Sequence, residues 1–103
     1  MKKSYDKISE AEFARIVSGI RDDRESIIKH NPIGTDDEIL LWMLLSCLIS
    51  YLNLSEIEMP CFHGKPDFET YRDAILHVLA KRKTAAFDER KYLDELVLSP
   101  TKI

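Results

Sequence analysis

The stretch from Ile39 to Ser55 carries no charged residue, and it constrains the fold more than any other feature of the sequence. It is about 17 residues long, at the short end of the range of roughly 17–25 residues for a membrane-spanning helix. Acidic residues flank it on both sides, and no basic cluster adjoins it to fix an orientation in a bilayer. We therefore expect a buried or interfacial helix and no membrane association.

This stretch is apolar almost all round, and on a helical wheel it resolves into two faces. One is a ridge of leucines, which neighbouring helices of the same chain can cover: Leu41, Leu44, Leu45, Leu48 and Leu52. The other has the alternating spacing of three and four that is typical of a helix–helix seam, and we expect a second copy of the chain to cover it in a homodimer. The alternative is a monomeric bundle with this helix at its centre. The predicted interface residues are Ile39, Trp42, Met43, Ser46, Ile49, Ser50 and Asn53.

Helix start and stop signals divide the rest of the chain into an all-α bundle. Ser9 to Glu12 and Thr35 to Glu38 match the capping-box pattern, and Asn31, which precedes a proline, is disfavoured in a helix. We predict three main helices at about 10–30, 36–54 and 68–83, and a short C-terminal helix at about 86–98. The first two should form an antiparallel hairpin, because their connection is short. Residues 1–103 should form a single helical domain, with 1–6 and 100–103 flexible.

Charge and cysteine content narrow the class of protein. The chain has 103 residues and a net charge of −3, so it lacks the overall positive charge of many nucleic-acid-binding proteins. Two cysteines cannot form a multi-disulfide framework, and acidic and basic residues follow Lys2 and Lys3 where a secretory signal would need an apolar run. We expect a cytoplasmic protein with reduced thiols.

One group of cysteine and histidine residues could carry chemistry. Cys61 and His63 form a Cys-x-His pair that, together with His77, could ligate zinc, or could serve as a thiol nucleophile with its base. Structural zinc sites usually have two such pairs at regular spacing, and no third residue orients the histidine. We expect a loop thiol and surface histidines, no cofactor and no enzymatic activity.

A basic cluster supplies the second hypothesis for function. It lies near the end of the third predicted helix and in the fourth, where it could contact phosphates. Acidic residues alternate with it, and positive charge also favours a helix C-terminus for purely structural reasons. The possible nucleic-acid contacts are Lys81, Arg82, Lys83, Arg90 and Lys91.

Arg24 lies in line with apolar residues of the first helix. Its stem could pack while its guanidinium reaches water, or it could pair with an acidic residue across an interface.

Taken together, the sequence favours a small non-enzymatic interaction or regulatory protein that acts through helix–helix association, as a homodimer. A nucleic-acid-binding regulator and a metal or thiol protein remain as alternatives.

Overall fold

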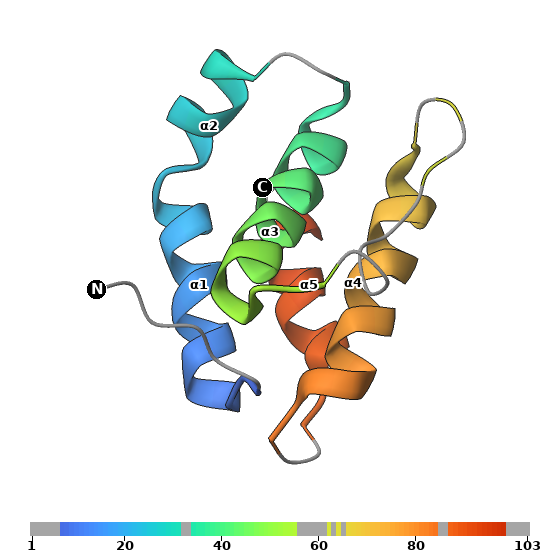
Figure 1. The fold of residues 1–103 in the computed structure, drawn as a ribbon. Helices are drawn as coiled ribbons and strands as arrows, with labels where there is room; N and C mark the ends of the chain where they lie inside the picture. The colour runs from blue at the N-terminus through green and yellow to red at the C-terminus, as the bar shows by residue number, and fades with distance from the viewer. Residues whose placement is uncertain are drawn as a thin grey trace.

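The described part of the chain is all-helical. A computed structural model describes residues 7–31, 34–55, 62, 64, 66–84 and 87–98. Figure 1 shows the arrangement, and outside its helices the described residues form only an isolated β-bridge. The all-α prediction is confirmed. The helices are α1 (Glu10–Asp22), α2 (Arg24–His30), α3 (Asp36–Leu52), α4 (Phe68–Arg82) and α5 (Glu89–Leu98).

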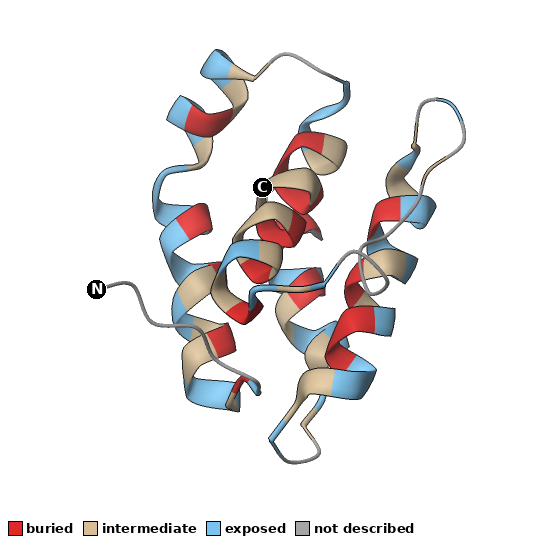
Figure 2. Ribbon diagram, viewed as in Figure 1, coloured by how far each residue is buried: buried red, intermediate tan, exposed pale blue. Residues whose placement is uncertain are grey.

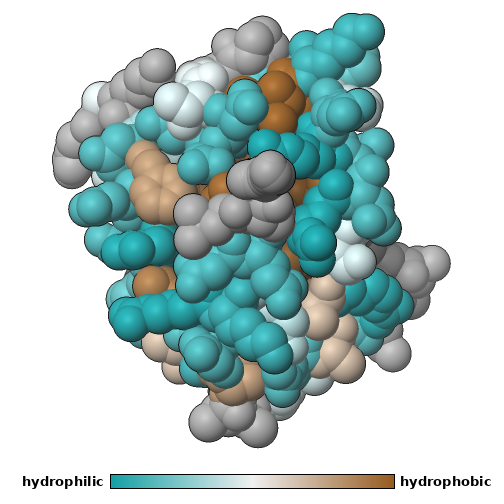
Figure 3. Space-filling model, turned by 180° about the vertical axis from the view of Figure 1, so that it is seen from behind, coloured by the Kyte–Doolittle hydropathy of each residue, from teal (hydrophilic) through white to brown (hydrophobic). Residues whose placement is uncertain are grey.

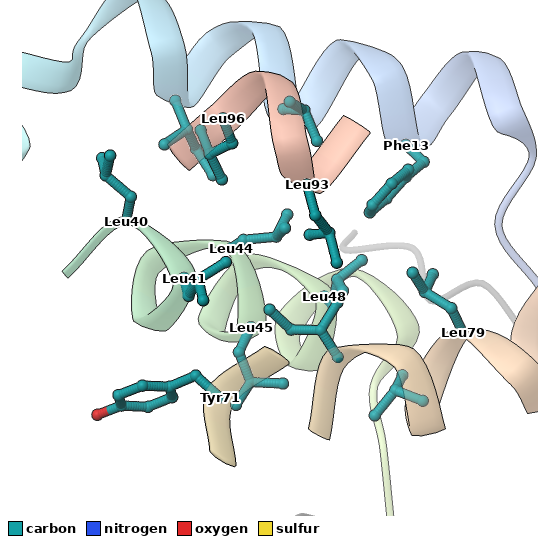
Figure 4. Packing of buried hydrophobic residues seen from close by; sticks show 14 of the residues in the cluster. Phe13, Leu40, Leu41, Leu44, Leu45, Leu48, Tyr71, Leu79, Leu93 and Leu96 are labelled. Carbon is teal, nitrogen blue, oxygen red and sulfur yellow. The ribbon is translucent and has the colours of Figure 1, made fainter. Parts of the chain in front are cut away.

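Helix α3 is the centre of the bundle, because it contacts all four other helices. Every residue of the predicted leucine ridge is buried, and Leu40 beside it is buried as well. Figure 4 shows Leu44 directed toward Leu93 of α5, whereas Leu45 lies on the side of Tyr71 and α4. Each fully buried leucine contributes roughly 1.5–3 kcal/mol relative to exposure, so this ridge is a large contributor to stability.

Side-chain caps fix where the helices begin. Glu38 donates its backbone N–H to Thr35 Oγ1 at 3.2 Å, and Thr35 donates its own to Glu38 Oε1 at 3.1 Å. This is the complete capping box that the sequence predicts. Asp67 caps α4 by accepting the Thr70 N–H at 2.9 Å. The Ser9 hydroxyl caps α1 by accepting the Glu12 N–H at 3.1 Å, which is one of the two hydrogen bonds of a capping box.

The predicted continuous helix over residues 10–30 is wrong, because it breaks at Asp23. This residue has φ −107° and ψ 19°, and its N–H is shared between the carbonyls of Gly19 and Ile20, both at 3.2 Å. Residues 21–26 are all polar, so no buried side chain holds this turn in a straight helix. After the break, Ile27 of α2 joins the core beside α3. The antiparallel orientation of the first two predicted helices stays a prediction.

Ile8 joins the N-terminal segment to the connection between α4 and α5. Its N–H donates to the Arg82 carbonyl at 2.7 Å, and its carbonyl accepts the Thr84 N–H at 3.0 Å. These bonds form a parallel bridge between Ile8 and Lys83, and the Ile8 side chain is fully buried. This pairing could not be predicted from the sequence, because a single bridge has no periodic pattern.

Other helix bounds lie within a few residues of the prediction. Helix α3 ends at Leu52 and not at 54, because Asn53 adopts the left-handed conformation with φ 52°. Helix α5 begins at Glu89 and not at 86. The terminal segments predicted to be flexible, 1–6 and 100–103, lie outside the described residues. None of the described helices is both long enough and apolar enough to cross a membrane.

Candidate functional site

The side of α3 opposite the leucine ridge is the part of the core helix that its own chain covers least. We call it the α3 outer face and define it as Trp42, Met43, Ser46, Ile49, Ser50 and Asn53. The first four are half-buried and the last two are exposed. Figure 2 shows intermediate and exposed segments along α3 between the buried ones. Three large apolar side chains of a core helix therefore keep access to solvent.

Ile39 does not belong to this face, although the sequence placed it there. Its side chain is 1% exposed and belongs to the same core cluster as Ile27 of α2. Helices α2 and α3 pack against each other, and both contribute residues to this cluster. Ile39, the first residue of the predicted interface, is therefore part of the core of its own chain.

The outer face is also anchored to the core from its edges. Trp42, Met43 and Ile49 pack against the buried cluster with part of their surface. Cys47, next to this face, is a half-buried free thiol whose pKa is raised by burial. A raised pKa keeps the thiol protonated at neutral pH, which makes it a poor nucleophile and a poor metal ligand. Cys47 also packs against the buried cluster, as a small apolar side chain does.

Asn53, which the sequence placed at the predicted interface, has a role in the backbone conformation at the end of α3. Its φ of 52° and ψ of 56° place it in the left-handed region, where asparagine and glycine are favoured over other residues. Its N–H donates to the Ile49 carbonyl and so closes the last turn of α3. The exposed side chain lies at the end of the outer face, but the helix end alone explains why asparagine stands here.

Arg24 faces an acid of its own chain. Burial raises the pKa of the Asp37 carboxyl, and the nearby positive charge of Arg24 partly offsets that increase. The Arg24 side chain is half-buried at the start of α2, close to the first turn of α3. Arg24 therefore acts electrostatically on Asp37 of its own chain, and pairing of Arg24 across an interface stays a prediction.

The basic cluster is divided by the fold. Lys83 Nζ lies 2.8 Å from Glu89 Oε1, 3.3 Å from the Phe87 carbonyl oxygen and 5.3 Å from the centroid of the Phe87 ring. Only 20% of the Lys83 side chain is exposed. Lys91 Nζ lies 5.9 Å from the centroid of the Tyr92 ring. The exposed members are Lys81, Arg90 and Lys91, while Arg82 and Lys83 are half-buried.

The candidate metal and thiol residues are not assembled in the described part of the molecule. Cys61 and His63 lie outside the described residues, and His77 is exposed on α4. Among the described residues, no group of three or more histidine, cysteine or acidic side chains could hold a metal ion.

The sequence did not predict a pocket of about 180 Å³ that lies among three helices. Leu41 of α3 contributes to its lining, as do residues of α4 and α5. The first and the last lining residue are more than 50 positions apart in the sequence, so no local motif could reveal the pocket. Its lining residues are Leu41, Phe68, Arg72, Leu93, Asp94 and Val97.

Comparison with known proteins found no matching family model, no matching curated protein and no matching solved structure. No functional residue is therefore carried over from a relative.

Proposed function

We propose that this protein is a non-enzymatic interaction or regulatory protein that associates through the α3 outer face, with a second copy of itself as the partner. The observation that carries the proposal is the incomplete cover of Trp42, Met43 and Ile49 on a helix whose other side forms the core. Tryptophan and methionine are enriched at protein interfaces relative to other surfaces. The proposed compartment is the cytoplasm, where a free thiol such as Cys47 stays reduced.

The expected association is weak. Full burial of a large apolar side chain is worth roughly 1.5–3 kcal/mol, and at most about a third of that remains for Trp42, Met43 and Ile49, which are already largely covered. Three such side chains on each of two copies provide about 3–6 kcal/mol at most, which is comparable to the smallest association costs of about 4 kcal/mol. These side chains alone would therefore not hold a dimer below millimolar concentration, and close contact of the two helices at Ser46 and Ser50 must add to their contribution.

Ser46 and Ser50 support a symmetric pairing of two α3 helices. In a two-fold dimer the same surface of each copy meets its counterpart, so residues near the axis face themselves. Small side chains there allow the two helices to approach closely. On the helical wheel, Trp42 and Ile49 lie on one side of the two serines and Met43 lies on the other, so that large side chains would pack on both sides of the close contact.

Light scattering behind a sizing column tests this proposal. The chain has a mass of 12.0 kDa, and we expect the average mass to rise toward twice that value between about 10 µM and 1 mM. Ser50→Lys places a charge on the exposed end of the outer face and should hold the mass at that of one chain. Ser18→Lys is the matched control, because Ser18 is also exposed but lies on α1.

Two outcomes would count against association through the α3 outer face. A mass of one chain over the whole concentration range would contradict self-association. A rise that Ser50→Lys and Ser18→Lys leave equally intact would show that association uses another surface.

A further inference from the structure

The pocket among α3, α4 and α5 has an apolar interior. Leu41, Leu93 and Val97 are buried residues that line it, and half-buried Phe68 completes the apolar lining. Figure 3 shows the rear face of the molecule, where hydrophobic side chains form small separate patches between hydrophilic ones. A pocket built from side chains of three helices has a shape that the packing of the bundle fixes in advance.

Its size restricts the ligand. The volume of about 180 Å³ is below the range of roughly 300–1,000 Å³ that is typical of sites for drug-sized molecules and cofactors. A cavity of about 150 Å³ with similar apolar lining is large enough for benzene. The pocket therefore fits one phenyl ring or one branched aliphatic side chain, and it excludes a nucleotide or a sterol.

Two charged side chains of opposite sign complete the lining. Arg72 comes from α4 and Asp94 from α5, and both are exposed. Among the described residues, Arg72 and Asp94 form no ion pair with each other. A guanidinium and a carboxylate on different walls of the same small apolar pocket can each take a ligand group of opposite charge.

This combination selects one chemical class. An apolar carboxylate would bring a second negative charge toward Asp94, and an apolar amine would bring a second positive charge toward Arg72. A zwitterion with an apolar side chain satisfies both. We propose that the pocket binds a free α-amino acid with an aromatic or branched apolar side chain. Its side chain occupies the apolar interior, its carboxylate binds Arg72 and its ammonium group binds Asp94.

Titration of the full chain with L-phenylalanine, followed by amide NMR shifts, tests the proposal. We expect saturable shifts at Phe68, Leu93 and Val97. Phenylacetate lacks the ammonium group and phenethylamine lacks the carboxylate, so each should bind about fivefold more weakly or worse.

The variants Arg72→Gln and Asp94→Asn should each weaken L-phenylalanine binding by about fivefold or more. Their matched controls are Arg90→Gln and Asp73→Asn, which alter exposed residues of α5 and α4 outside the pocket and should leave the affinity unchanged. All four positions are exposed, so folding should be preserved, and the amide spectrum of each variant verifies this.

Absence of shifts at about 10 mM L-phenylalanine, which corresponds to binding too weak to be specific, would overturn the proposal. Equal affinity for phenylacetate or phenethylamine would also overturn it, because the pocket would then accept any apolar side chain, including one presented by a protein. Unchanged affinity in both Arg72→Gln and Asp94→Asn would have the same meaning.

Discussion

Lys83 and Glu89 form an ion pair, with Nζ 2.8 Å from Oε1, that closes the connection between α4 and α5. Both side chains are mostly buried, with 20% and 18% exposed. Burial raises the pKa of the Glu89 carboxyl, but the hydrogen bond from Lys83, a hydrogen bond from the backbone of Glu89 and the charges of Lys83 and Arg90 together outweigh it and leave the pKa below its ordinary value. Lys83, which the sequence suggested as a possible phosphate contact, thus pairs with an acidic residue of its own chain.

The first prediction concerns the pH dependence of this pair. Because its folded pKa is lowered, Glu89 contributes stability above its ordinary pKa of 4.5, and that contribution is lost as the pH falls through the folded value. Glu89→Gln should lower the free energy of unfolding by about 1–2 kcal/mol at pH 7. Urea unfolding at about pH 7 and pH 3 should show this difference shrink at the lower pH.

Glu95→Gln is the control, since Glu95 Oε1 lies 3.7 Å from Arg21 Nη1 in an ion pair whose side chains are more exposed. We expect its effect to stay within about 0.5 kcal/mol. An equal cost of Glu89→Gln at both pH values would argue against the ion pair.

The second prediction concerns Ile8, which the sequence did not place in the core. Its side chain is fully buried and its backbone bonds to the α4–α5 connection. Ile8→Ala should therefore cost about 2–4 kcal/mol of unfolding free energy, as expected for a buried isoleucine. Half-buried Ile28 provides the comparison, and Ile28→Ala should cost distinctly less. Equal effects would mean that the N-terminal segment does not belong to the stable fold.

The third prediction separates the backbone role of Asn53 from a role at an interface. A residue with φ 52° accepts glycine readily, whereas alanine is strained there. Asn53→Gly should change the unfolding free energy by less than about 0.5 kcal/mol, and Asn53→Ala should cost about 1 kcal/mol. The mass in solution should be the same for both variants. A loss of association in Asn53→Gly would restore the interface role of the amide.

The fourth prediction distinguishes the two sides of α3. Leu48 is fully buried, so Leu48→Ala should cost about 2–5 kcal/mol in chemical unfolding. Ile49 is half-buried, so Ile49→Ala should cost less in dilute protein and should weaken association at high concentration. If Ile49→Ala destabilised dilute protein as much as Leu48→Ala, the outer face would be part of the monomer core.

The predictable parts of the fold are those with a local physical signature. The Thr35–Glu38 capping box and the Asp67 cap can be read from sequence because their partners lie three residues apart. The leucine ridge can be read because burial follows the helical period. The predicted end of the second helix was late by two residues, because asparagine in the left-handed conformation cannot be recognised from spacing alone.

The missed parts depend on contacts between distant residues. The break at Asp23 leaves the helical spacing of the apolar residues on either side unchanged, and Ile39, which periodicity had assigned to the outer face, is buried in the core. The Ile8 bridge and the pocket containing Arg72 and Asp94 join segments that the chain brings together only on folding. Likewise, the positive charge of Lys83 is evident from sequence, but its pairing with Glu89 is evident only in the folded structure.

Isotope-filtered NOE measurements on a mixture of labelled and unlabelled protein test association through α3 most directly. At millimolar concentration, we predict intermolecular NOEs from the Trp42 indole and the Ile49 methyl groups of one copy to the outer face of the other. Intermolecular NOEs confined to other helices, or none from a particle of 12.0 kDa at that concentration, would contradict the account.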